Sequence, residues 1–283
     1  MMAQQTLGRG DRRSRRRGRG ALVIAALWIG ALGGGVARAE APAAVEWSFE
    51  PGGVLSGGTV PALPDLPIQL IVDDDSPEGQ FGIGGATAQQ FLWFNQFDRP
   101  TLLNYDLEEI WVLFPPGPNL AVGEPIQLVV YVDPDSDPSN GAELLATFDE
   151  TIQEVDGGTF SVYPLDPPVA VQTAGDLLIG VVSRFVESGV TGPTEPAALD
   201  TTASLGRSWL AVWTTDPPLE PALPPDLFID RVDVFVAGNW MIRGFGSPRS
   251  IVEVPTLGGA GLALLAGLLV AAGGFLARRR SAE

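Results

Sequence analysis

The chain contains no histidine and no cysteine, and all 17 of its basic residues are arginine. Without imidazole or thiol groups it cannot form a Ser-His-Asp triad, a Cys-His pair, a His-ligated zinc or haem site, an iron–sulfur cluster or a disulfide. A glycosidase that uses two carboxylates is the least excluded enzyme chemistry. Glu108 and Glu109 do not form such a pair, because neighbours in a strand point to opposite faces. We therefore expect a protein without catalytic activity.

Acidic residues outnumber basic ones by 34 to 17, and the excess is concentrated in the middle of the chain. Residues 40–254 hold 32 acidic residues and six arginines, which gives a formal charge of −26. A surface of this sign repels phosphate backbones and anionic lipid headgroups. Nucleic acid is therefore excluded as a partner of this region, and divalent cations and neutral sugars remain reasonable ligands.

The N-terminal residues 1–39 have the three parts of a secretory signal peptide. A cationic stretch ends at Arg19, an apolar stretch follows over residues 21–36, and Ala37 and Ala39 form an A-x-A cleavage signature. Cleavage after Ala39 would make Glu40 the first residue of the exported protein. The alternative is an uncleaved membrane anchor, for which the apolar stretch is short.

The C-terminal residues predict one transmembrane helix. Residues 258–277 carry no charge, and a helix of about 20 residues crosses a hydrocarbon core of roughly 30 Å. Arg278, Arg279 and Arg280 follow, and this positive charge favours a cytoplasmic location for the tail, residues 278–283. The acidic middle region would then face outward.

A short motif precedes the predicted span: Val254, Pro255, Thr256 and Leu257. With the span and the arginine cluster it resembles the Ile-Pro-Thr-Leu variant of the PEP-CTERM family of bacterial sorting signals. The resemblance implies export, recognition by an exosortase-like or related membrane protease, cleavage near the motif and transfer to the envelope. A plain single-span anchor is the alternative, and either outcome places the protein at the cell surface.

Residues 40–246 are predicted to form an all-β domain. Apolar residues alternate, and Gly- and Pro-rich turn clusters separate short runs, which is typical of strands. We expect a two-sheet β-sandwich of jelly-roll type, with a linker over residues 247–257 that contains the sorting motif. The expected strands are 45–50, 68–72, 90–97, 104–114, 126–133, 143–150, 159–163, 177–186, 208–214, 231–236 and 240–245.

Two segments of this region resemble an accessory jelly-roll module of secreted bacterial proteins. They are Gly206-Arg207-Ser208-Trp209 and Asn239-Trp240-Met241-Ile242-Arg243. The resemblance implies an accessory or adhesive role. We expect Trp240 and Arg243 to stabilise the sandwich, with Arg243 paired to an internal carboxylate.

Alternating carboxylates after one predicted strand suggest a calcium site. Asp133, Asp135, Asp137 and Asn140 have the spacing by which a calcium loop presents oxygen ligands. The EF-hand pattern is broken, because Pro138 and Leu144 replace its glycine and glutamate. The alternative is an acidic hairpin loop whose side chains cap backbone groups. Asp73 and Asp75, in a run of three aspartates, form a weaker second candidate.

Seven tryptophans could supply a platform for stacking sugars, or they could fill the core. In the segment 91–97, Phe91, Trp93 and Phe97 share one face. Alternation in the segment 126–133 predicts that Ile126, Leu128, Val130 and Val132 face the core and that Gln127, Tyr131 and Asp133 point outward. Tyr131 is therefore the best single candidate for an exposed ring.

We therefore expect an exported, surface-anchored, non-catalytic β-sandwich protein of the bacterial envelope or extracellular matrix, with a structural or adhesive role and calcium as its candidate cofactor. The alternative is a carbohydrate-binding, lectin-like or carbohydrate-active surface protein whose partner is a polysaccharide.

Overall fold

A computed structural model describes residues 46–51, 62–84, 90–98, 104–117, 119–184, 194–213, 220–249, 263–264 and 266–270. The chain divides into two compact units, residues 1–248 and 249–283. The described part of the first unit consists of β-strands, turns and two short 3-10 helices, Pro138–Asn140 and Val232–Val234. The all-β prediction is confirmed.

Short strands bounded by Gly, Pro and Asp turns make up the first unit. They are β1 (Glu46–Pro51), β2 (Ile68–Leu70), β3 (Gly79–Gly84), β4 (Gln90–Phe97), β5 (Tyr105–Leu113), β6 (Pro125–Asp133), β7 (Glu143–Thr151), β8 (Phe160–Val171), β9 (Asp176–Ser183), β10 (Thr194–Asp200), β11 (Ser208–Trp213), β12 (Phe228–Arg231), β13 (Asn239–Trp240) and β14 (Ile242–Pro248).

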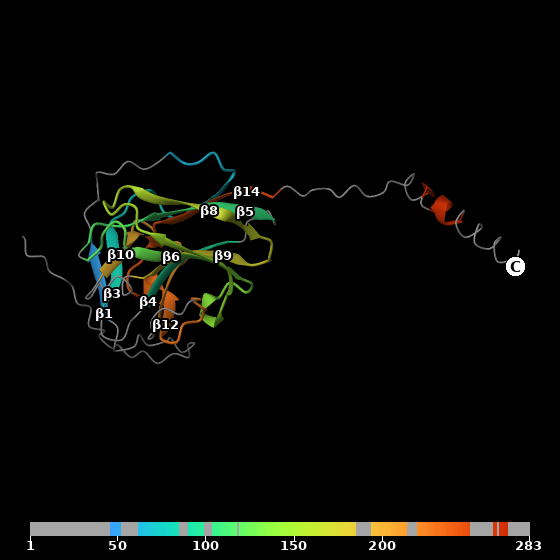
Figure 1. The fold of residues 1–283 in the computed structure, drawn as a ribbon. Coiled ribbons are helices and arrows are strands. Elements are labelled where there is room, and N and C mark those ends of the chain that lie inside the picture. The colour runs from blue at the N-terminus through green and yellow to red at the C-terminus, as the bar shows by residue number, and fades with distance from the viewer. Residues whose placement is uncertain are drawn as a thin grey trace, which may run out of the picture. The chain divides into compact units, whose positions relative to one another are not determined.

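The strands form three antiparallel sheets, where the sequence had predicted two. Their strand orders are β1-β3-β10-β13, β12-β11-β4-β9-β6-β7 and β2-β14-β5-β8. Figure 1 shows the layer of β5, β8 and β14 lying over the layer of β6 and β9, with β1, β3 and β10 beside them. Several pairs of neighbouring strands are distant in sequence, as in the pairing of β3 with β10.

All three sheets share one hydrophobic core. From the six-stranded sheet, alternate residues of β6 point into it, as predicted: Ile126, Leu128, Val130 and Val132. The same cluster contains Leu107, Ile110 and Val112 of β5, Ile242 of β14, and Phe81, Leu199 and Trp240 of the sheet that contains β3, β10 and β13. The other face of the six-stranded sheet is also covered, since Val129, Tyr131 and Leu178 pack with Trp209 and Leu223.

One side chain joins the three sheets directly. Asn95 of β4 is fully buried. Its Nδ2 donates to the carbonyl oxygens of Trp240 in β13, at 2.8 Å, and of Ile242 in β14, at 2.9 Å. Its Oδ1 accepts a hydrogen bond from Ser208 Oγ at 2.6 Å. Because β13 and β14 belong to different sheets, Asn95 fixes the point at which the sheets meet.

The predicted strands agree with the structure at most positions and fail at four. Residues 231–236 were predicted as a strand, but the chain forms the 3-10 helix Val232–Val234 after β12. The predicted strand 240–245 is interrupted at Met241, where β13 ends and β14 begins in another sheet. β3 and β10 were not predicted, because β3 has three glycines and β10 contains Pro196 and few large apolar residues.

In the second unit, residues 263–264 and 266–270 are helical. Among the described residues, no helix has the length and apolar character needed to cross a membrane. Most of the predicted span 258–277 lies outside the described residues. The same holds for the cleavage signature Ala37 and Ala39, the motif Val254–Leu257 and the cluster Arg278–Arg280.

Candidate functional site

The last residue of β6, Asp133, and the loop that follows it carry the four residues predicted to bind calcium. Each aspartate accepts a hydrogen bond from the backbone N–H two residues later: Asp133 from Asp135 at 3.3 Å, Asp135 from Asp137 at 3.2 Å and Asp137 from Ser139 at 3.1 Å. Asn140 Nδ2 donates to Asp135 Oδ2 at 2.8 Å. The carboxylates thus line the inside of one tight loop, and calcium binding there stays a prediction.

Asp133 differs from the other residues of this loop because it is buried. Its side chain has no exposed surface, and Oδ2 has no hydrogen-bond partner. Burial, together with the neighbouring carboxylate of Asp135, raises the pKa of Asp133 to about 6. One oxygen of this carboxyl group is thus buried without a donor that compensates it.

Asp176 of β9 lies directly opposite Asp133 in the antiparallel pairing of β6 with β9. Like charges facing each other across two strands are destabilising. The charge of Asp176 is compensated, because its Oδ2 accepts from Gln96 Nε2 at 2.7 Å and lies 3.5 Å from Arg207 NH1. Gln96 Nε2 also donates to the Ser136 carbonyl oxygen at 3.2 Å, which ties the loop to β4.

The weaker predicted metal site, Asp73 and Asp75, is paired with a buried arginine. Arg243 of β14 and Asp73 have almost no exposed side-chain surface, and Arg243 forms ion pairs with both aspartates. Arg243 Nε also donates to Asp73 Oδ2 at 3.1 Å, and the guanidinium carbon lies 4.3 Å from the ring centre of Phe160. The predicted pairing of Arg243 with an internal carboxylate is therefore present, and the guanidinium balances the buried charge of Asp73 without a metal ion.

A third acidic group was not predicted. The carboxylate oxygens of Asp74, Glu78 and Asp200 lie within 4.8 Å of one another, and this group of the described residues could hold a metal ion. Glu78 Oε2 accepts from Thr201 N at 2.8 Å, and Asp200 Oδ1 accepts from Thr202 N at 2.8 Å. Asp200 is almost fully buried, and burial raises its pKa. The sequence signal was the Asp73–Glu78 turn, but nothing local indicated that the end of β10 would join it.

Glu195 of β10 is another buried carboxyl group. It accepts hydrogen bonds from Ser48 Oγ and, at 2.6 Å, from Gln80 Nε2. Burial raises its pKa above that of an ordinary glutamate, the hydrogen bond from Gln80 opposes this effect, and Glu50 adds to it. Glu195 joins β10 to β1 and β3, the strands that carry its two donors.

This raised pKa predicts a loss of stability as the pH rises. A group whose pKa is higher in the folded state contributes stability below its unfolded pKa and loses that contribution as the pH passes its folded pKa. Between about pH 4.5 and pH 8, the melting temperature of the wild type should fall more than that of Glu195→Gln, as followed by circular dichroism. Glu143→Gln, which alters an exposed carboxyl, should behave as the wild type. Equal falls in the wild type and Glu195→Gln would contradict the assignment.

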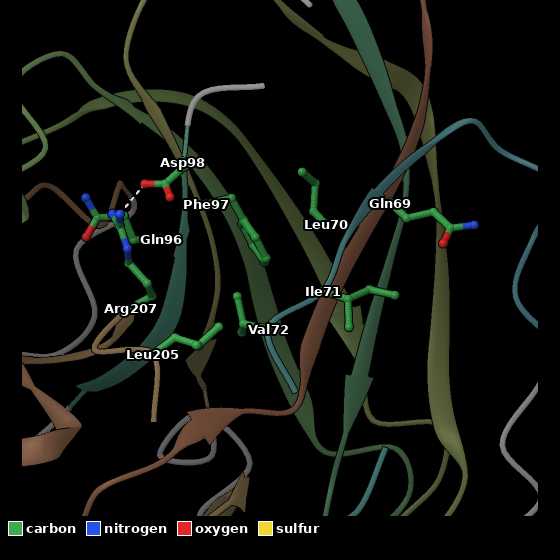
Figure 2. Close-up of a pocket in the computed structure, with 9 residues that line it drawn as sticks. All are labelled: Gln69, Leu70, Ile71, Val72, Gln96, Phe97, Asp98, Leu205 and Arg207. Carbon is green, nitrogen blue, oxygen red and sulfur yellow. Dashed lines mark ion pairs between the residues drawn. The ribbon is translucent and has the colours of Figure 1, made fainter. Parts of the chain in front are cut away.

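A pocket of about 490 Å³ lies between the segment that contains β2 and the end of β4. Leu70, Ile71 and Val72 form one wall, and Gln96, Phe97, Asp98, Leu205 and Arg207 lie across from them. Figure 2 shows the ion pair between Arg207 and Asp98 at the polar side of this pocket. Gln96 is common to the pocket and to the network that holds Asp176 and the Ser136 carbonyl.

The aromatic side chains fill the core and do not form a sugar platform in the described residues. Trp93, Trp111, Trp209, Trp213 and Trp240 are buried, and Trp47 is half-buried. The prediction of an outward Tyr131 is wrong, because its ring is fully buried and its hydroxyl donates to the Pro221 carbonyl oxygen at 2.8 Å. The alternation rule assumed a solvent-exposed second face, but the segment around Leu223 covers it.

Comparison with known protein families finds a match for the C-terminal segment of the chain. Residues 254–280 match the IPTL-CTERM motif, which confirms the predicted C-terminal sorting signal and supports export to the cell surface. No curated protein matches the chain. One similar solved structure is that of the cysteine protease and lectin-like domains of Cwp84, a surface layer associated protein of Clostridium difficile. The alignment has 14% identity and a TM-score of 0.41, and it covers 66% of this chain and 37% of that one.

Proposed function

We propose that this chain, which ends in an IPTL-CTERM motif, is an exported protein displayed on the bacterial surface. Its β domain, a sandwich of jelly-roll type, would have a structural or adhesive role in the envelope or extracellular matrix. The observation that carries the proposal is the match over residues 254–280. The A-x-A signature at Ala37 and Ala39 and the formal charge of −26 over residues 40–254 support it, because both suit an exported, soluble ectodomain.

The two ends would act in sequence. Removal of the signal peptide after Ala39 releases the N-terminus of the exported chain. The apolar segment 258–277 and the arginines 278–280 hold the C-terminus in the membrane until an exosortase-like protease acts near Val254–Leu257. Processing then transfers the β domain to the envelope.

The role proposed for the β domain is non-catalytic. The chain has no imidazole or thiol, so proton transfer and nucleophilic attack would depend on carboxylates or hydroxyls. The buried carboxylates Glu195 and Asp200 instead accept hydrogen bonds that join separate strands and loops, from Ser48 and Gln80 to Glu195 and from Asp74 N to Asp200. These contacts suit a rigid scaffold.

Calcium is the cofactor that we propose for this domain. Its acidic loops offer oxygen ligands without nitrogen or sulfur, which is the set that calcium prefers. Extracellular calcium modules bind with dissociation constants of about 10⁻⁴–10⁻³ M, so the site would fill at calcium concentrations of this order.

Surface display predicts that changes in the sorting motif alter processing. In the producing bacterium, Pro255→Ala should leave the chain unprocessed in the membrane fraction, because the protease would no longer recognise its motif. Protease treatment of intact cells, followed by immunoblotting, distinguishes displayed from retained protein. Pro248→Ala, just outside the matched residues, is the control and should be processed normally. Normal processing of Pro255→Ala would contradict a role of the motif in sorting.

A further inference from the structure

The strongest unexplained feature of the described structure is the carboxylate of Asp133. It is fully buried, and its Oδ2 is one of three buried side-chain polar atoms without a hydrogen-bond partner. The other two belong to Trp47 and Tyr105, whose uncharged groups are less costly to bury. A carboxyl group is costly to bury unless a positive charge or several hydrogen-bond donors compensate its oxygens.

The protein surroundings of Asp133 add negative charge. Asp135 lies in the same loop, and Asp176 is its register partner on β9. Arg207 lies 3.5 Å from the Asp176 carboxylate and forms a closer ion pair with Asp98, so its charge is directed to those two groups. Among the ion pairs found in the described residues, none involves Asp133 or Asp135.

The carboxyl group of Asp133 faces the acidic loop, where the side chain of Asp135 is near enough to add to the effect of burial in raising the pKa of Asp133. Asp133 Oδ1 accepts the N–H of Asp135, so the carboxylate folds over the turn that follows β6. Asp135 is held in turn, because its two oxygens accept from Asp137 N and Asn140 Nδ2. The loop therefore presents two fixed carboxylates, one buried and one exposed, and Gln96 fixes its Ser136 carbonyl to β4.

We propose that Asp133 and Asp135 hold a divalent cation, calcium, at the buried end of the loop that follows β6. This assignment rests on the proposed calcium-binding role of the domain and gives that role a site. The cation supplies the compensation that Asp133 Oδ2 lacks, and it screens Asp133 from Asp176. Asp137 and Asn140 would shape the loop through their caps, with Asp137 accepting from Ser139 N and Asn140 donating to Asp135.

The rival site is formed by Asp74, Glu78 and Asp200, whose carboxylate oxygens lie within 4.8 Å of one another but already accept hydrogen bonds. Asp200 Oδ2 accepts from Asp74 N at 3.2 Å, and Asp74 Oδ1 accepts from Ser76 Oγ at 2.7 Å. Together with the bonds from Thr201 and Thr202, these contacts satisfy the group without an ion. Of the two sites, only the one at Asp133 contains a buried carboxylate oxygen without a hydrogen-bond partner, and such an oxygen indicates a missing ligand.

Calcium titration of the full chain and two variants tests the assignment. Each protein is stripped with a chelator, then titrated with CaCl2 by isothermal titration calorimetry, with melting temperatures followed in parallel. The wild type should bind calcium and melt at a higher temperature when calcium is present. Asp133→Asn should lose at least about tenfold in affinity, whereas Asp74→Asn should bind as the wild type does.

The possible outcomes test the location of the site separately from the proposal that the domain binds calcium. Loss of binding in Asp74→Asn but not in Asp133→Asn would overturn the site and leave the calcium role intact. No heat and no melting shift in the wild type would overturn both. If Asp133→Asn does not fold, Asp135→Asn replaces it, because Asp135 is exposed and its substitution should leave the fold intact. Wild-type affinity in Asp135→Asn would then count against the assignment.

Discussion

Replacement of Arg243 by methionine is expected to destabilise the β domain by about 3–5 kcal/mol, because removing one partner of a buried ion pair leaves the other charge uncompensated. The partner is Asp73, whose carboxylate has no exposed surface. The guanidinium also packs on the ring of Phe160 and is the only charged side chain buried in β14. Urea denaturation of the full chain, followed by tryptophan fluorescence, measures the change in free energy of unfolding.

The double variant Asp73→Asn/Arg243→Met is the control for this mechanism. It removes both charges, so it should recover part of the stability that Arg243→Met loses. Arg243→Lys keeps the charge but loses the bidentate contact with Asp73, so its loss of stability should be intermediate. A loss below about 1 kcal/mol in Arg243→Met would show that the pair is not desolvated as described.

Replacement of Asn95 by leucine is expected to cost about 3 kcal/mol or more. The Nδ2 group of Asn95 satisfies two buried carbonyl oxygens, on Trp240 and Ile242, and each buried group left without a partner costs about 1–3 kcal/mol. Since these carbonyls belong to β13 and β14, the variant should also loosen the junction of the sheets. The free energy of unfolding from urea denaturation is again the measurement.

Ser208→Ala is the matched comparison for Asn95→Leu. It removes one hydroxyl from the same network, the donor to Asn95 Oδ1 and the acceptor of Trp240 N. It leaves Asn95 Oδ1 and Trp240 N without a partner, so it should cost about 2 kcal/mol, less than Asn95→Leu, which removes the donor of both carbonyls and also the acceptor of the Ser208 hydroxyl. An equal or larger effect of Ser208→Ala would mean that Asn95 is not the centre of the junction.

Strands with strong alternation could be predicted from the sequence, and strands defined by close backbone approach could not. The inward face of β6 follows from its apolar residues at every second position. β3 could not be predicted by alternation, because it contains Gly82 where a larger residue would give the strand signal. Gly82 lies against β10, and a Cβ atom there would come 1.7 Å from the Thr194 carbonyl oxygen. A glycine required by such contact weakens the local strand signal, although it is what allows β3 and β10 to pair.

The candidate cation sites show the same division. The loop containing Asp133 and Asp135 could be predicted as a candidate cation site because its acidic residues are close in sequence. The burial of Asp133 could not be predicted, because alternation placed its side chain on the outward face of β6, and other segments of the chain cover that face. Asp200 joins Asp74 and Glu78 only through the fold, since more than a hundred residues separate it from them. Local spacing therefore identified candidate ligands, and tertiary contacts determined which of them lack compensation.

The central claim, that the protein is exported and sorted through its IPTL-CTERM motif, is tested most directly by the intact mass of the protein recovered from the producing cells. We predict a species that begins at Glu40 and ends near Leu257, without the apolar segment 258–277 and the arginines that follow it. A mass equal to that of the complete 283-residue chain would contradict both processing steps.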